Sequence, residues 1–308
     1  MHTVSRFSGS RQLQLYTHTL ILLSLLSFAV PVRSDQHEME TSLRNHFEKR
    51  ILVLRNFYSD STLHFDKEGN LLGDAKLGYC SSDSTIYVDG MKIDKQHVLT
   101  IKGKRVLNLF DEKSGHLNNV LTKVPIQIVV ELDSTWQDAS QVELLLDKIV
   151  TTDIRQTADA IPKYWQCWIY GSVEQSEKGI WKCSSDNVPH VESIGLSASS
   201  GAMAKYSVRN GKRVFYVGGS VLPPVKMFSP APKYVPLAKE KRIQGTTVLD
   251  LIINEQGEVS VIGIAKPLGA GLDDEAIRTI RTWRFKPATR NLEPVAVFVH
   301  METKFALY

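Results

Sequence analysis

Residues 243–264 read IQGTTVLDLIINEQGEVSVIGI, and this stretch decides how the C-terminal part of the chain folds. From 249 to 253 a leucine or isoleucine stands at every second position, which is typical of a strand with one buried face. The turn at 254–257, Asn-Glu-Gln-Gly, is followed by a second apolar run at 259–264. Two such runs around a glycine turn predict a β-hairpin.

A helix is predicted on each side of this hairpin. The first covers Leu237–Arg242 and ends before Gly245, because glycine often follows the last turn of a helix. The second begins at Asp273, which we expect to be the N-cap residue. Leu272 before it and Ile277 four residues after it have the spacing of a hydrophobic staple.

The last strand is expected at residues 294–303, where apolar side chains again alternate with others. Pro287 separates it from the second helix. The order helix, strand, strand, helix, strand predicts a three-stranded antiparallel sheet with two helices on one face. We therefore expect the α+β class.

Five short motifs make this region specific: Pro232-Lys-Tyr234-Val-Pro236, Ile243-Gln-Gly245-Thr-Thr-Val248, Asn254-Glu-Gln-Gly257-Glu-Val259, Leu272-Asp273-Asp274-Glu275-Ala276 and Thr282-Trp283-Arg284-Phe285-Lys286-Pro287-Ala288. In this order and spacing, residues 230–308 resemble the C-terminal domain of TonB-family proteins. Most of these residues are expected to maintain the fold, namely Tyr234, Gly245, Gly257, Trp283, Arg284, Phe285 and Pro287. Trp283 and Phe285 would supply large apolar area between helix and sheet.

The resemblance implies a function for the last strand. In the family, this sheet edge meets the periplasmic face of outer-membrane transporters, whose short N-terminal peptide pairs as an added strand. The predicted partner-binding residues are Val295, Val297, Phe298, Val299, His300 and Met301. The resemblance thus implies an outer-membrane TonB-dependent transporter as partner, bound by strand addition.

The chain departs from energy-transducing members of the family in two ways. Its leader contains only His18 as a polar candidate for coupling to a proton-driven motor, and a folded region replaces the long proline-rich spacer. An alternative is therefore a periplasmic scaffold or cell-wall-binding protein that retains the fold without energy transduction. Such a protein could form a homodimer through the same last strand.

The remainder of the mature chain, residues 35–222, is predicted to be a β-rich α+β domain of unassigned role. A helix is expected from Met39 to Leu54, because apolar residues recur there at helical spacing. Lys102, Lys104 and Arg105 are expected at a solvated turn. Residues 223–233 are proline-rich and are predicted to be a linker to the domain at 234–308.

Residues 1–34 resemble a secretory signal peptide. Their apolar stretch, Leu20–Val32, is 13 residues long, whereas a membrane span needs about 20. Cleavage is expected after Ala29 or Ser34. We expect a periplasmic protein; an uncleaved anchor in the inner membrane, with the chain facing the periplasm, remains an alternative.

Export places the three cysteines in an oxidising compartment. Cys167 and Cys183 lie close enough in sequence to form a disulfide, the alternative being two buried thiols. Cys80 would then be a small core residue.

Composition and motifs also disfavour several classes of function. Lys and Arg exceed Asp and Glu by four over the whole chain, and three of the arginines lie in the leader, so nucleic acid is not an expected partner. No nucleophile elbow, zinc-protease motif or phosphate-binding loop is present in the sequence, so we expect no enzyme, no cofactor and no metal. Asp273, Asp274 and Glu275 form a carboxylate run, which we interpret as helix capping.

Overall fold

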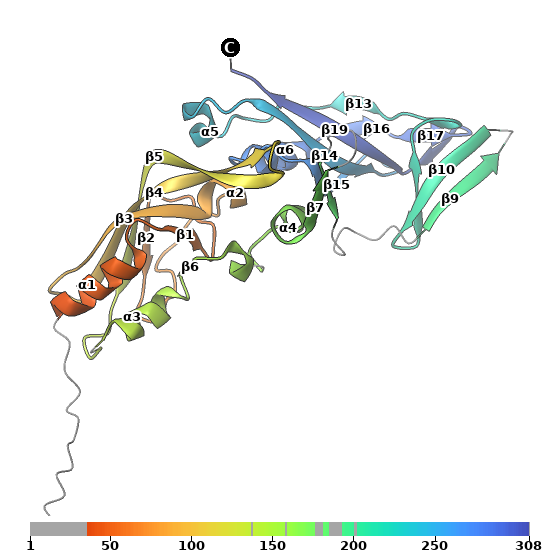
Figure 1. Cartoon of the computed structure of the whole chain (residues 1–308). Helices are drawn as coiled ribbons and strands as arrows, with labels where there is room; N and C mark the ends of the chain where they lie inside the picture. Colours follow the sequence, from red (N-terminus) through yellow and green to blue (C-terminus); the bar gives the residue numbers. More distant parts are fainter. Residues whose placement is uncertain are drawn as a thin grey trace, which may run out of the picture. The chain divides into compact units, whose positions relative to one another are not determined.

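The computed structural model describes residues 36–136, 138–157, 159–175, 181–184, 193–199 and 202–307 (Figure 1). The predicted leader lies outside the described residues. Within the described part, no helix is long and apolar enough to cross a membrane. The fold is α+β with few helices and many strands, which confirms the predicted class.

Seven helical segments occur among the described residues, and all are short. They are α1 (Gln36–Phe47), α2 (Cys80–Asp83), α3 (Ala139–Leu146), the 3-10 helix η1 (Ile154–Thr157), α4 (Lys163–Tyr170), α5 (Pro236–Glu240) and α6 (Leu272–Ile280).

The N-terminal sheet has six strands in the order β2-β5-β4-β3-β1-β6. They are β1 (Ile51–Leu54), β2 (Thr62–Phe65), β3 (Thr85–Ile93), β4 (Val98–Asp111), β5 (His116–Glu131) and β6 (Val150–Thr151). Neighbours are antiparallel except β2 and β5, which are parallel. Helices α1 and α3 lie side by side against this sheet and share a core with it (Figure 1).

Two predictions for this region were wrong. The helix expected over Met39–Leu54 ends at Phe47, because Lys49 takes a positive φ of 58° and the β-prone run after it pairs with β3 as strand β1. Lys102, Lys104 and Arg105 are not at a turn but in the middle of β4. Only 2 % of the surface of Arg105 is exposed. Its guanidinium donates to the backbone carbonyls of Asp83, Tyr58 and Asp60.

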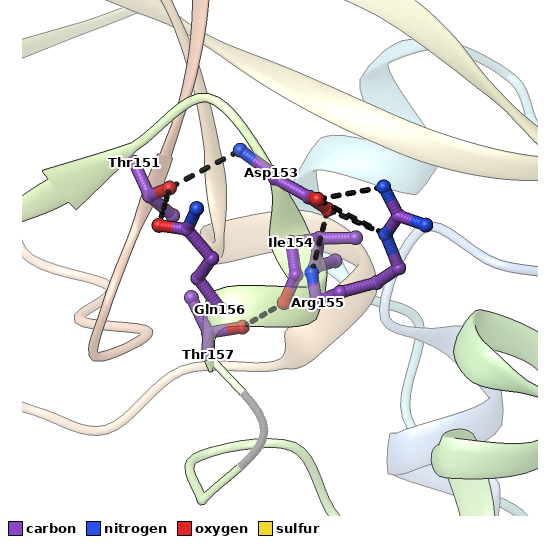
Figure 2. Close-up of polar contacts among 6 residues, drawn as sticks. All are labelled: Thr151, Asp153, Ile154, Arg155, Gln156 and Thr157. Atoms are coloured by element: carbon purple, nitrogen blue, oxygen red, sulfur yellow. Dashed lines mark hydrogen bonds and ion pairs between the residues drawn. The ribbon is translucent and has the colours of Figure 1, made fainter.

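A compact turn leads from β6 towards α4 (Figure 2). The Asp153 carboxylate accepts from Arg155, with Nη2 at 2.7 Å from Oδ2. The Thr151 hydroxyl donates to Gln156 Oε1 at 2.8 Å, and the Thr157 hydroxyl donates to the carbonyl of Ile154 at 2.6 Å. These local bonds fix the direction in which the chain leaves the first sheet, whereas the exposed ion pair itself contributes little to stability.

The C-terminal sheet also has six strands, in the order β15-β14-β19-β11-β10-β9. They are β9 (Ser193–Ser199), β10 (Ala202–Arg209), β11 (Lys212–Tyr216), β14 (Gly245–Ile253), β15 (Val259–Lys266) and β19 (Val297–Phe305). Strands β15, β14 and β19 form the predicted antiparallel set. The other three extend it, because β11 pairs with β19 in parallel.

Short strands complete the C-terminal part. They are β7 (Ser172–Gln175) with β8 (Trp181–Ser184), β12 (Val221–Leu222) with β17 (Ala288–Arg290) and β18 (Glu293–Val295), and β13 (Val225–Phe228) with β16 (Arg284–Lys286). The proline-rich segment predicted as a linker thus contains a strand that pairs with β16. This pairing makes the segment part of the C-terminal fold. The strand can form because two of the prolines precede β13 and the others follow it, so its backbone N–H groups are all present.

The second hydrophobic core crosses the predicted domain boundary. It joins Phe57, Leu107 and Trp165 from the N-terminal part to residues of α6 and β14. Trp168 on α4 also belongs to it, and its indole N–H donates to the carbonyl of Ile264 in β15 at 2.8 Å. The described residues between 36 and 307 therefore form one packed unit.

Candidate functional site

Strand β19 lies between β14 and β11 in the C-terminal sheet, and only part of its length is exposed as a sheet edge. On one side it pairs with β14 over its full length, from Gly245 opposite Phe305 to Ile253 opposite Val297. On the other side β11 reaches only its first two residues. Beyond Phe298, no strand among the described residues pairs with β19 on this side.

The direction of each backbone N–H follows from one hydrogen bond. The amide of Phe215 donates to the carbonyl of Ala296 at 2.8 Å, so the even-numbered residues of β19 turn their backbone groups towards β11. By alternation, His300, Glu302 and Lys304 direct their N–H and C=O groups away from β14. We call residues 299–305 the open edge, because these three residues can accept a further strand there.

The predicted partner-binding residues fall into three groups. Val295 is not in β19 but at the end of β18, opposite Ala288. Val297 and Phe298 are already paired on both sides, and Val297 is fully buried. The single strand expected at 294–303 was wrong at both ends, since Ala296 interrupts it and β19 continues to Phe305. Only Val299, His300 and Met301 lie on the open edge.

His300 also carries the main polar contact beside the open edge. Its Nδ1 is 2.7 Å from Oδ1 of Asp250, the residue opposite it in β14. Burial raises the pKa of Asp250 above its ordinary value, and His300 partly offsets this effect. The His300 ring also stands edge-on to Phe298, at 4.9 Å between centroids, and Phe298 in turn contacts Tyr216 of β11. The side chains on this face of the sheet therefore connect the open edge to β11.

The predicted capping role of Asp273 was wrong. Gly271 occupies the N-cap position of α6 with φ 75°, and a Cβ atom there would lie 2.9 Å from Ser82 Oγ. Asp273 lies in the first turn, fully buried, and accepts from the amides of Leu268 (2.9 Å) and Gly269 (2.6 Å). Its carboxylate therefore holds the loop before α6, and burial raises its pKa to about 6.

Asp274 and Glu275 connect α6 to distant parts of the chain. Both oxygens of Asp274 lie 3.1 Å from the indole nitrogen of Trp165, and the Tyr164 hydroxyl also donates at 3.1 Å. Burial, together with the nearby charge of Asp273, raises the pKa of Asp274 to about 7. Glu275 is likewise buried, but the Tyr79 hydroxyl (2.7 Å) and Arg278 (2.6 Å) donate to it, and its pKa is lowered.

These contacts were absent from the sequence-based expectation. Apart from Arg278 and from Lys233, which is 42 residues away, the partners of Asp274 and Glu275 lie between 109 and 196 residues away along the chain, so no local pattern could indicate them. Their effect is to tie α4 and the segment around α2 to the first turn of α6. The carboxylate run therefore has a structural role that differs from capping.

Trp165 offers a direct test of this connection. Replacing it with phenylalanine should destabilise the protein by about 1–3 kcal/mol, because the buried carboxylate of Asp274 loses a donor. The loss should be larger at about pH 8 than at about pH 5, since the bond favours the ionised form. Trp168→Phe is the matched control: its donation to a neutral carbonyl should give a loss that does not depend on pH. Equal pH profiles in chemical denaturation of the two variants would contradict the assignment.

Three of the family-motif residues, Tyr234, Trp283 and Phe285, belong to the second hydrophobic core or pack against it. Tyr234 donates to the carbonyl of Ile243 and stands edge-on to Phe305, while Trp283 and Phe285 are buried in the core. Gly257 has φ 78°, and a Cβ atom there would lie 1.8 Å from the carbonyl oxygen of Phe285. The glycine is therefore required by the turn and by the close approach of β16.

Three further motif residues lie outside the core. Gly245 does not end the helix, because α5 stops at Glu240 and Arg242 takes the positive φ, 53°; Gly245 begins β14. Arg284 is exposed on β16, and Pro287 separates β16 from β17.

Cys167 on α4 and Cys183 on β8 form a disulfide, with 5.9 Å between their Cα atoms, and Cys80 is a buried free thiol.

A comparison with protein families agrees with this arrangement of hairpin, helix and last strand. Residues 230–307 match the model of the Gram-negative bacterial TonB protein C-terminal. The chain carries a TonB-family C-terminal domain. A search of curated proteins found no match to the chain. The TonB-type domain begins after β13, so β9, β10 and β11 extend its sheet from outside the matched residues.

Proposed function

We propose that this TonB-like protein acts in the cell envelope as an interaction module, whose TonB-type domain binds an extended segment of an outer-membrane transporter by strand addition. The observation that carries the proposal is the open edge of β19. A row of outward backbone groups at the edge of a sheet is the template that an added strand uses.

The proposal implies a short footprint for the partner strand. Within the described part of β19, His300, Glu302 and Lys304 are the residues whose backbone groups face away from β14 without a paired strand, so the partner would pair over about five to seven residues. Most of its affinity would come from main-chain hydrogen bonds. The side chains of these three residues are exposed, with one carboxylate between two basic groups, so the partner's charge is not strongly constrained.

A titration of the exported chain tests the proposal. Synthetic peptides from the N-terminal segments of candidate outer-membrane transporters would be labelled and followed by fluorescence anisotropy. We expect one of them to bind, and the same peptide with proline at alternate positions not to bind, because proline lacks the donors for the ladder. Binding that does not change with the proline substitutions would contradict strand addition.

One observation favours the alternative function, a scaffold that retains the fold without a transporter partner. Strand β11 already occupies the first two positions of β19 in a parallel pairing, where a longer partner strand would also bind. Absence of binding for every transporter peptide, together with a monomer–dimer equilibrium that depends on residues 299–305, would favour this scaffold.

The proposed location gives a separate prediction. The exported protein should begin between Val30 and Gln36, because a signal peptide with a short apolar stretch is removed after translocation. N-terminal sequencing of the periplasmic fraction checks this. An intact Met1 in the inner-membrane fraction would instead support the anchored alternative.

A further inference from the structure

The paired strands β13 and β16 place apolar and cationic side chains on one surface. Val225 lies opposite Lys286, and Phe228 lies opposite Arg284. Residues opposite each other in an antiparallel pair share a face. The register shift between Lys226 and Phe228 inserts one extra residue, so Val225 and Phe228 stand on the same face although they are three positions apart.

We call this surface the ribbon face; it consists of Val225, Phe228, Arg284 and Lys286, with Met227 at the bulge. Its three apolar side chains are exposed by 56 % at Val225, 75 % at Met227 and 56 % at Phe228. The opposite face packs against the protein, since Phe285 on that face is buried in the core. Three exposed large apolar side chains within four residues form a patch that water does not favour.

The charge of this ribbon has one sign. Strands β13 and β16 contain Lys226, Arg284 and Lys286 and no acidic residue. The Arg284 guanidinium donates to the backbone carbonyl of Trp283 at 2.8 Å, and the Lys226 ammonium lies 4.7 Å from the centre of the Trp283 ring. Within the described residues, no carboxylate forms an ion pair with these three cations. Lys226 lies opposite Phe285 on the other face, so the cations of the ribbon face are Arg284 and Lys286, and their charge remains available to a partner. Glu258 lies opposite Arg284 in an isolated β-bridge, but its carboxylate accepts from the side-chain amide of Asn254 at 3.0 Å.

We propose that the ribbon face docks on an anionic lipid surface. Apolar side chains interleaved with Lys and Arg are the chemistry of interfacial membrane binding, in which the apolar groups enter the boundary between headgroups and acyl chains. The cations add attraction to anionic headgroups and lie at their level. This proposal does not depend on transporter binding, because the ribbon face and the open edge consist of different residues.

Vesicle sedimentation tests the proposal with the exported full-length chain. We expect binding to vesicles of phosphatidylcholine with about one quarter phosphatidylglycerol, and little binding to pure phosphatidylcholine. Raising NaCl from about 0.05 M to about 0.5 M should weaken binding at least about threefold by screening the cations.

The variants separate the apolar and cationic contributions. Met227→Ser with Phe228→Ser should weaken partition at least about tenfold, because two apolar side chains no longer enter the interface. Arg284→Gln with Lys286→Gln should remove the preference for the anionic lipid. Leu144→Ser is the matched control, since Leu144 is 67 % exposed but lies on α3. Circular dichroism melting should show that all three proteins are folded.

Two outcomes would overturn the proposal. One concerns vesicle binding: either the parent protein does not sediment with anionic vesicles, or the double variant Met227→Ser with Phe228→Ser sediments with them as much as the parent does. The other is a concentration-dependent dimer that this double variant abolishes, seen by sedimentation velocity without vesicle binding, which would make the ribbon face a contact between two copies. Binding to transporter peptides should be the same in every variant, so the two proposals fail independently.

Discussion

Replacing Glu302 with proline is expected to remove peptide binding at the open edge while leaving the protein folded. The backbone N–H of Glu302 points away from β14, so proline deletes a donor that no described strand uses. A partner strand would lose the central donor of its ladder, and the ring would obstruct its approach. We expect affinity to fall at least about tenfold.

Met301→Pro is the matched control, because it changes the adjacent residue of the same strand. The N–H of Met301 faces β14, so this variant should lose at least about 2 kcal/mol of folding stability. Circular dichroism melting and peptide anisotropy would be measured on both variants. If Glu302→Pro is folded and binds the peptide as tightly as the parent, the open edge is not the docking edge.

Replacing Asp274 with asparagine should make folding stability less dependent on pH between about pH 5 and about pH 8. The folded-state pKa of Asp274, about 7, is above the ordinary value of 3.8. Between about pH 5 and about pH 7 the unfolded chain has already lost the proton that the folded protein still binds, so the stability of the parent falls as pH rises to about 7 and levels off above it. Asparagine does not titrate, and we expect it to remove a decrease of about 2 kcal/mol.

The control for this prediction is Asp66→Asn. The pKa of Asp66 is lowered, chiefly by Asn70, so its contribution is present above pH 4 and should not change between about pH 5 and about pH 8. Urea denaturation at both pH values gives the comparison. An Asp274→Asn variant whose stability falls with pH as steeply as that of the parent would contradict the assignment.

The parts of the fold that were predictable are those with a local pattern. Alternating apolar residues and a glycine turn predicted β14 and β15, and the spacing of Leu272 and Ile277 predicted α6, although its N-cap is Gly271 rather than Asp273. The helix expected up to Leu54 shows the limit of periodicity. Ile51 and Leu54 have helical spacing with Phe47, but the four-residue apolar run is also suited to a buried strand, and β3 supplies the partner.

The candidate site was predictable only in part. A strand near residue 300 followed from the sequence, but its neighbour β11 did not, because parallel pairing leaves no turn motif between the partners. Asp273 was assigned to the N-cap because aspartate is common there, whereas the loop amides that it holds and the left-handed Gly271 are visible only in three dimensions. Contacts between residues distant in the sequence therefore determine the role of Asp273 and the neighbours of β19, and the local sequence pattern does not indicate them.

The parallel pairing of β11 with β19 also determines the order in which the protein can assemble. Phe215 meets Val297, 82 residues later, so the C-terminal sheet has a high contact order and should form slowly. Until the final residues are available, β9–β11 and β14–β15 are two separate groups of strands with bare edges, a state that favours aggregation. During biogenesis strand β19 therefore joins the two groups into one sheet. In a chain that ends before Val297, neither group would gain the neighbouring strand that it needs to fold.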